Sequence, residues 1–456
     1  MDSLTHCVAG SLTPFLFAKA PKRAALILFG AFAGQLPDID AFFSSGTPEG
    51  LMAIHRGVTH AIVWQPFLML AYVVPWYIFF CCQKEQTPPP LSNAAQSPSS
   101  FRPSLWLLCG IALFAQYIHL FLDSVTTFGT QIFLPLSSYR VALPGMFIVD
   151  FFLLIPLLLL VIFAWRKSPS FSSPWSSKTR TLAHIGLAWL ILYPLGNLGI
   201  NHALTLAYAK EYAVSPRQVT VFTEPFSPFV WKKVVWQGDT CLMETVYPLQ
   251  DMVRGEFSGE RFTRLSLIGT ERVLTMARMQ GERPVQGNPR LASVDGGLYI
   301  TKLGTKLAPL DKDSIVTASG DLPTQDTFSA RALVPAQPLT ASSKLSSLKE
   351  AFLYEVPDRK LLRFLSKEIP LFSLFCEFAP TLVLTDVEHD VVNDHLGLVT
   401  YSFADVRYLV SPQSPARFFG VTTTPFAFEV QMSHGRVYAY RYLDHLEDTF
   451  TPWIRL

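Results

Sequence analysis

Long apolar runs occur throughout the first 208 residues and are absent afterwards. Four runs have the length of a membrane span, about 20 residues; they cover 61–82, 104–122, 146–165 and 182–208. The last run contains Pro194, Gly196 and Gly199, which predicts a kinked or tilted helix. Two shorter runs, 4–18 and 24–36, come first and either span the membrane or form a re-entrant hairpin. The pattern predicts an α-helical polytopic membrane domain over residues 1–210.

From about residue 211 the pattern changes to short stretches rich in β-branched and aromatic residues, which favour strands. These stretches are 234–247, 261–268, 297–303, 397–409 and 418–442. Ser433-His434-Gly435 is typical of a hairpin turn. Amphipathic helix is predicted within 345–374, with interruptions near Pro357 and Pro370. We therefore expect a β-rich extramembrane domain over residues 211–456, which would cover a site or bind a protein partner.

Positive charges in the connecting loops predict the orientation of the spans. If six segments cross or enter the membrane, nine Lys and Arg fall on one side and only Arg56 and Arg140 on the other. The nine are Lys19, Lys22, Arg23, Lys84, Arg102, Arg166, Lys167, Lys178 and Arg180. Since positive loops stay in the cytoplasm, the amino terminus and residues 211–456 are expected to face outward. In a bacterial inner membrane that side is the periplasm.

Composition narrows the classes of partner and cofactor. Lys and Arg number 37 against 35 Asp and Glu, so the net charge of +2 argues against a nucleic-acid partner. The six cysteines include no CxxC pair, which removes the usual zinc-ribbon and redox motifs. Cys241 and Cys376 both lie in the expected outer domain, where a disulfide between them is an open alternative.

The main functional signal is the position of His and Asp in the apolar half, because ionisable residues beside spans are costly and tend to be functional. The topology, derived from Lys and Arg alone, brings them to the outward side, with His184 as the exception. The candidate metal ligands are Asp2, His6, Asp38, Asp40, His55, His60, His119 and Asp123. Asp150 and His202 reach the same side, and Arg56 and Arg140 lie there as candidates for binding an anionic substrate group or lipid headgroups.

Spacing indicates which chemistry these residues suit. Asp2-x3-His6 and His119-x3-Asp123 each place a carboxylate and an imidazole one helical turn apart. Carboxylate and imidazole together suit zinc or a related divalent metal. The number of ligands exceeds the need of one tetrahedral ion, so two or three ions are expected. The alternatives are ordinary helix caps, solvated histidines and a proton path.

Four ordered motifs carry a resemblance to a known family. They are 2–6 (DSLTH, followed by Gly10), 34–40 (GQLPDID), 55–60 (HRGVTH) and 119–123 (HLFLD, leading into TTFGT at 126–130). Over about the first 200 residues the chain resembles the YdjM family of membrane-bound hydrolases, which are regarded as metal-dependent. The segment 225–231 (PFSPFVW) is similar to one in the longer members.

The order of these ligands is also similar, more distantly, to zinc-dependent phospholipases C and single-strand-specific zinc nucleases. Those enzymes use three zinc ions on phosphate esters, which implies phosphate-ester chemistry here. Their downstream His-x3-Asp pair is missing from this chain; Asp150 and His202 replace it imperfectly.

These observations lead to one functional hypothesis and one alternative. The hypothesis is a membrane hydrolase that acts on a phosphate ester or lipid-linked ester at the outer interface, with Asp40 or Asp150 as general base. The alternative is a non-catalytic envelope or transport protein that uses the polar residues for structural ions or protons. A further polar cluster in the outer domain is interpreted as an exposed acidic loop; it comprises Asp386, His389, Asp390, Asp394 and His395.

Overall fold

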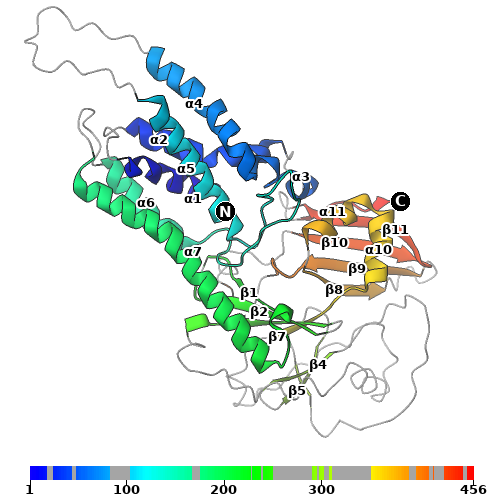
Figure 1. Cartoon of the computed structure of the whole chain (residues 1–456). Coiled ribbons are helices and arrows are strands. Elements are labelled where there is room, and N and C mark those ends of the chain that lie inside the picture. The colour runs from blue at the N-terminus through cyan, green and yellow to red at the C-terminus, as the bar shows by residue number, and fades with distance from the viewer. Residues whose placement is uncertain are drawn as a thin grey trace, which may run out of the picture. The chain divides into compact units, whose positions relative to one another are not determined.

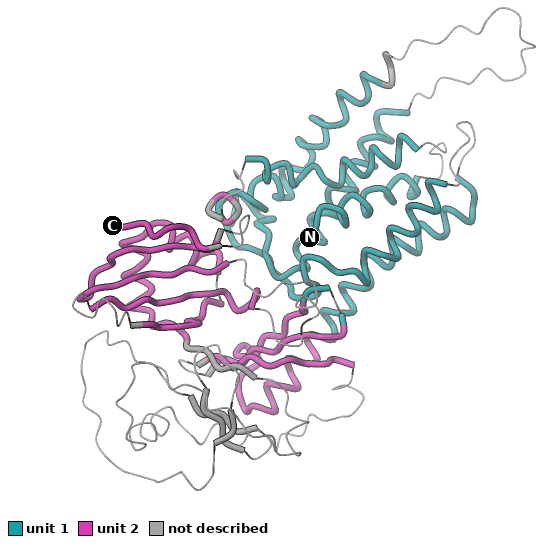
Figure 2. Tube along the Cα trace, turned by 180° about the vertical axis from the view of Figure 1, so that it is seen from behind, with its two compact units in different colours: residues 1–46, 53–199, 225–228 teal, residues 47–52, 200–224, 229–456 magenta. Residues whose placement is uncertain are grey.

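The computed structural model of the chain divides into two compact units (Figure 2). Unit 1 comprises residues 1–46, 53–199 and 225–228, and unit 2 comprises 47–52, 200–224 and 229–456. The described residues are 1–17, 24–43, 48–82, 103–166, 175–226, 228–237, 240–249, 290–294, 297–301, 308–310, 351–379, 381–389, 397–409, 414, 426–444 and 449–456. The division between the units falls inside helix α7.

Unit 1 is helical (Figure 1). Its α-helices are α1 (Ser3–Leu12), α2 (Ala24–Gln35), α4 (Gln65–Cys82), α5 (Leu105–Ser124), α6 (Phe151–Arg166) and the first part of α7 (Ser177–Glu211). The 3-10 segments η1 (Thr13–Leu16), η2 (Leu36–Phe42), η3 (Val58–His60) and η4 (Ile62–Trp64) extend or join them. The helix α3 (Pro48–Ala53) belongs largely to unit 2.

Four helical segments are long and apolar enough to cross a membrane: Ala24–Phe42, Ile62–Phe79, Leu105–Ser124 and Ser177–Glu211. The run at 24–36 reaches this length because η2 continues α2. The run at 146–165 does not, because its helix begins only at Phe151 and has 16 residues. The chain before that helix is used for tertiary contacts, since Met146 pairs with Thr126. At 1.5 Å per residue, the 35 residues of α7 extend about 52 Å, well beyond a hydrocarbon core of about 30 Å.

Small residues determine how closely α1 and α2 approach. Gly10 on α1 faces Gly30 and Gly34 on α2, and a Cβ on any of the three would overlap backbone of the other helix. Because lipid tails provide no hydrophobic drive for helix association, this close backbone packing is a main source of attraction. It also brings the start of α1 beside the end of α2, where the polar residues lie.

Unit 2 is β-rich. Its large sheet has the strand order β1-β2-β3-β7-β8-β9-β10-β11-β12, with β13 on β11, and neighbouring strands run antiparallel. The strands are β1 (Val219–Thr223), β2 (Trp231–Gln237), β3 (Thr240–Val246), β7 (Ala351–Glu355), β8 (Leu382–His389), β9 (Leu398–Asp405), β10 (Ala427–Ser433), β11 (Arg436–Asp444), β12 (Thr449–Phe450) and β13 (Ile454–Arg455). A separate small sheet contains β4 (Arg290–Val294), β5 (Gly297–Thr301) and β6 (Ala308–Leu310).

Helices pack on the large sheet at two places. The last turns of α7 bury Tyr208 and Tyr212 in one core with Val221 of β1 and Trp231 of β2. The helices α10 (Arg359–Glu368) and α11 (Pro370–Phe378) lie beside β9 and β10 (Figure 1), where Phe372 contacts the rings of Phe403 and Phe428. The predicted fold class, a helical membrane domain followed by a β-rich domain, is confirmed.

Local predictions in unit 2 had mixed outcomes. The hairpin turn is present between β10 and β11, with positive φ at His434 and Gly435. The helix predicted within 345–374 is present as α10 and the start of α11, with breaks near Pro357 and Pro370, whereas 351–355 pairs with β3 as a strand. Cys241 and Cys376 are not joined by a disulfide. The predicted strand at 261–268 lies outside the described residues, as do Asp390, Asp394 and His395.

Candidate metal centre

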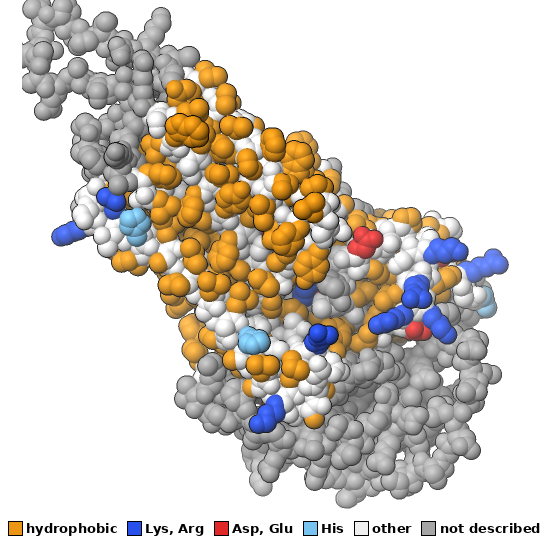
Figure 3. Space-filling view, in the orientation of Figure 1, with side chains coloured by type: hydrophobic (Ala, Val, Ile, Leu, Met, Phe, Trp, Pro, Cys, Tyr) orange, Lys and Arg blue, Asp and Glu red, His pale blue; other side chains and the backbone are white. Residues whose placement is uncertain are grey.

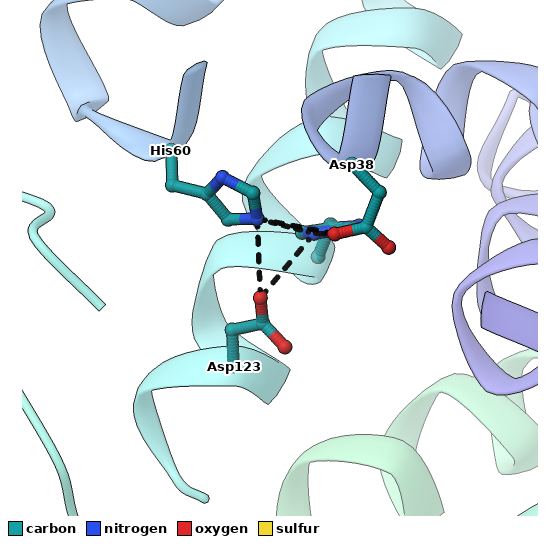
Figure 4. Close-up of side chains that lie close together, drawn as sticks. Asp38, His60 and Asp123 are labelled. Atoms are coloured by element: carbon teal, nitrogen blue, oxygen red, sulfur yellow. Dashed lines mark hydrogen bonds and ion pairs between the residues drawn. The ribbon is translucent and has the colours of Figure 1, made fainter. Parts of the chain in front are cut away.

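Four buried side chains from three separate elements meet at one end of the helices of unit 1. Asp38 comes from η2, His60 from η3, and His119 and Asp123 lie one turn apart on α5. Figure 4 shows that His60, Asp38 and Asp123 point toward one another. The four offer donor atoms that all lie within 4.8 Å of one another. The arrangement is therefore a candidate metal centre.

The donor atoms are as close as ligands of one ion. His60 Nε2 lies 3.1 Å from His119 Nε2, 3.2 Å from Asp123 Oδ2 and 3.3 Å from Asp38 Oδ1. His119 Nε2 lies 3.4 Å from each of the same two carboxylate oxygens. A tetrahedral zinc ion with ligands at about 2.0 Å requires about 3.3 Å between ligand atoms, from the geometry of a tetrahedron. The five distances match that spacing.

Hydrogen bonds on the outer side of each ring direct lone pairs into this centre. His119 Nδ1 lies 2.7 Å from the Gly34 carbonyl oxygen, which can only accept, so Nδ1 carries the proton and Nε2 of the neutral ring does not. His60 Nδ1 likewise faces Asp40 Oδ2 at 3.2 Å. Outer acceptors of this kind typically orient metal-bound histidines. Two imidazole lone pairs and two carboxylates thus face one another, which suits a cation between them.

Asp123 gives a second indication that a cation fits. Among the described residues, none donates a hydrogen bond to its buried Oδ2 atom, the atom that faces both histidines. Its other oxygen, Oδ1, lies 2.9 Å from Arg56 Nη2 and contacts the Met1 amino group. A buried carboxylate oxygen without a donor is costly unless a cation compensates it.

Asp40 lies behind His60 rather than among the four inner ligands. Its Oδ2 accepts hydrogen bonds from the Arg56 backbone N–H at 3.0 Å and from Thr59 Oγ1 at 2.6 Å, besides facing His60. Its Oδ1 lies 2.8 Å from His55 Nδ1. Asp40 therefore ties the segment 55–60 to η2. Asp38, Asp40 and His55 also form a second group of possible ligands, which shares Asp38 with the first.

Arg56 and Arg140, the two arginines near the centre, have different surroundings. Arg56 is 2% exposed, and besides Asp123 its guanidinium binds Thr126 Oγ1 at 2.9 Å. Its φ of 59° is unusual for a residue other than glycine, and it turns the backbone N–H toward Asp40. Arg140 donates weaker bonds to the carbonyl oxygens of His55 and Gly129, at 3.4 and 3.5 Å. Arg140 is partly exposed, whereas Arg56 is buried.

The remaining predicted site residues lie around the four ligands. The His6 ring stacks on His119 with centroids 3.5 Å apart, and its Nε2 lies 3.2 Å from Asp123 Oδ1. Asp2 caps α1 by accepting from Thr5 N and Thr5 Oγ1. Neither Asp2 nor His6 belongs to either group of possible ligands, although their spacing predicted both as ligands.

Asp150 is also separate from the two ligand groups. Its Oδ1 accepts from the backbone N–H of Phe152 and Leu153 at the start of α6, and its Oδ2 accepts from the Tyr193 hydroxyl at 2.7 Å. Burial raises the pKa of Asp150, and the bond from Tyr193 partly opposes that shift. These contacts are those of a helix cap.

The carboxylates around His60 raise the pKa of its imidazole. Burial lowers this pKa, but the neighbouring carboxylates of Asp123, Asp38 and Asp40 outweigh burial and raise it to about 10. The surrounding carboxylates therefore favour a positive charge at this position, carried by a proton or a metal ion.

Three supporting contacts were not predicted from the sequence. Thr59 bonds Asp40, Gln35 Nε2 donates to Asp38 Oδ2 at 2.9 Å, and the Gly34 carbonyl oxygen orients His119. Gln35 and Thr59 lie inside the motifs at 34–40 and 55–60, close to predicted ligands. This proximity is the feature of the sequence that could have identified them. A backbone carbonyl has no signal in the sequence.

Four membrane-length helical segments and a buried His/Asp centre define an integral membrane protein with a candidate metal site. Residues 1–205 match the model of the family described as YdjM inner membrane protein, so the resemblance predicted from the motifs is confirmed for this part of the chain. All of the candidate ligands lie within the matched residues. No curated protein and no solved structure matches the chain.

Proposed function

We propose that this protein is a membrane-bound, metal-dependent hydrolase with a divalent ion, most simply zinc, held by Asp38, His60, His119 and Asp123. The observation that carries the proposal is the tetrahedral spacing of four acceptor atoms in a buried site. A bound divalent ion would supply an acidified water and polarise an ester oxygen. The substrate class is a phosphate ester or lipid-linked ester.

The chain's own residues prepare the site for this chemistry. Asp40 and the Gly34 carbonyl oxygen hold the two histidines in the tautomer that leaves Nε2 bare, and Arg56 orients Asp123. Arg140 is the candidate for binding the anionic part of the substrate. Both carboxylate oxygens of Asp40 already contact hydrogen-bond donors, so we propose that the main role of Asp40 is to position His60. Asp40 and Asp150 remain the candidates for a general base.

We assign one ion to each chain. The second ligand group shares Asp38, and its Asp40 oxygens already face N–H and O–H donors. Metal analysis of purified protein tests this point: one equivalent supports the assignment, and two or three equivalents support the larger cluster predicted from the number of ligands.

The proposed activity is tested with a panel of phosphate esters and lipid-linked esters, assayed with the full-length protein in nanodiscs. We expect metal-dependent turnover that the His119→Ala variant lacks. Turnover equal to protein-free nanodiscs for every ester, with metal bound, would contradict the hydrolase proposal.

A structural metal is the second candidate, because four protein ligands fill a tetrahedral shell and structural sites are typically closed. All four residues are under 9% exposed. The ester assay distinguishes a structural ion from a catalytic ion. A structural ion stabilises the fold without turnover of any ester, which agrees with the alternative of a non-catalytic envelope protein.

The proposal includes an outward-facing site. The asymmetry of Lys and Arg in the loops supports an orientation in which the centre and unit 2 face the periplasm of a bacterial inner membrane. A reporter fused after Leu456 tests this: activity of a periplasmic reporter supports it, and activity of a cytoplasmic reporter contradicts it.

Asp40→Asn is expected to weaken metal binding by about 10–100-fold while leaving the number of ions unchanged, as is typical when an outer partner of a metal-bound histidine is altered. The amide can still accept one bond but loses the charge that holds His60 Nδ1–H. Competition with a chromophoric chelator measures the change. Asp358→Asn, at the exposed N-cap of α10, is the matched control and should leave affinity unaltered. Equal affinities of Asp40→Asn and wild type would contradict the positioning role.

A further inference from the structure

The depth of the candidate centre in the bilayer follows from helix α5. Trp106, near its start, is 85% exposed, and tryptophan on lipid-facing surfaces typically lies at the membrane interface. Asp123 follows Trp106 by 17 positions, which is about 26 Å along a helix. Since the hydrocarbon core is about 30 Å thick, Asp123 lies just inside the opposite interface.

Two segments near the centre expose large apolar side chains at or just beyond the ends of the membrane-length segments. The end of η2 exposes Phe42 by 87% and Phe43 by 68%. The loop between α5 and α6 exposes Leu136 by 89%, Tyr139 by 68% and Phe133 by 46%. Soluble surfaces rarely gather so many large apolar groups, and such a patch usually marks an interaction surface.

These two segments border the most exposed edge of the centre. Among the residues of the two ligand groups, the side chain of His55 is 17% exposed and the side chain of Asp38 is 9% exposed. The side chains of His60, His119 and Asp123 are fully buried. Asp40, two residues before Phe42, binds the His55 ring, and Arg140, next to Tyr139, binds the His55 carbonyl oxygen.

The apolar segments also continue a surface that faces lipid. The backbone N–H of Ile62 bonds the Ile132 carbonyl oxygen, which joins the α5–α6 loop to the start of the span at η4 and α4. Trp64 and Phe67 on that span are 41% and 63% exposed. Figure 3 shows hydrophobic side chains covering the visible face of the helical unit.

From this continuity we infer that Phe42, Phe43, Phe133, Leu136 and Tyr139, here named the apolar lip, insert into the interfacial layer of the bilayer beside His55. The occupant of the lip is the acyl-chain region of a lipid leaflet. The exposed edge of the centre then lies level with lipid headgroups. Insofar as it concerns substrate, the inference rests on the proposed function: an ester carried by a membrane lipid would reach the centre laterally.

The test labels full-length protein in nanodiscs with 5-fluorotryptophan and adds one ¹⁹F resonance through Leu136→Trp. Two probes are compared: a phospholipid with a nitroxide near its headgroup and a soluble gadolinium chelate. We expect the lipid nitroxide to abolish the new resonance and the chelate to leave it. Phe43→Trp should behave in the same way. Both substitutions lie on exposed side chains, and an unfolding temperature equal to that of the wild type checks that the protein is folded.

Phe67→Trp on α4 is the control for lipid contact, and Leu249→Trp, 53% exposed in unit 2, is the control for exposure to water. Loss of the Leu136→Trp resonance with the chelate alone would place the lip in water and overturn the inference. Resistance to both probes would mean that unit 2 or a second copy covers it, which also overturns the inference. These results do not depend on bound metal, so they remain interpretable if metal analysis contradicts the proposed function.

Discussion

His119→Ala is expected to abolish stoichiometric metal in the purified protein. The change removes one of four ligands and also the ring that stacks on His6 and bonds the Gly34 carbonyl oxygen. Altering only an outer partner of a ligand costs about 10–100-fold in affinity, so loss of a ligand should exceed 100-fold. Elemental analysis after dialysis against a chelator measures the outcome.

His184→Ala is the matched control, because His184 is exposed on α7 and outside the ligand groups. It should retain the wild-type metal content. A His119→Gln variant separates ligand loss from cavity formation, since its side chain fills more of the space. If folded His119→Ala and His119→Gln both retain one equivalent of metal, the proposed centre is wrong.

Gly30→Ala is expected to produce a large loss of stability for the addition of a single methyl group in the membrane domain. The new Cβ would overlap the Gly10 carbonyl oxygen, which is rigid helix backbone and cannot rotate away. Forcing an extra methyl group into a tightly packed contact typically costs 1–3 kcal/mol, and we expect about 3 kcal/mol here because both partners are backbone. Thermal unfolding in detergent measures the effect.

Gly196→Ala provides the comparison, because a Cβ at Gly196 meets nothing within 4 Å. That change should be neutral or slightly stabilising, since alanine favours helix over glycine by about 1 kcal/mol. The Gly30→Ala variant should also bind metal more weakly, because separation of α1 from α2 moves the Gly34 carbonyl oxygen from His119. Equal unfolding temperatures for the two variants would refute the close α1–α2 packing.

The metal centre illustrates the limits of reading function from spacing. Asp2 and Asp150 have the same chemistry and expected depth as Asp38 and Asp123, yet both cap helices. Local sequence does not distinguish the roles, because a carboxylate beside a helix start serves as a cap or as a ligand depending on what packs against it. Arg56 is similar: its pairing with Asp123 depends on a contact 67 residues away in the chain.

Residues 351–355 and the start of α6 show the same limit in the fold. The first segment lies in a stretch with an amphipathic helical pattern but pairs with β3, more than a hundred residues earlier. In the second, the helix α6 begins at Phe151 rather than at Met146, because Met146 pairs with Thr126. In both cases non-local hydrogen bonds outweighed local propensity.

What the sequence determined by itself is three of the four membrane-length helices, the change to a β-rich half, and the set of His and Asp residues from which the buried centre is drawn. These properties depend on hydrophobic length and alternation, which are local along the chain. Only the tertiary structure decided which residues meet. The convergence of Asp38, His60, His119 and Asp123 depends on the Gly10–Gly30–Gly34 contact and on the bonds of Asp40 to residues 55–60. Those are packing distances between segments far apart in the sequence, which no local pattern specifies.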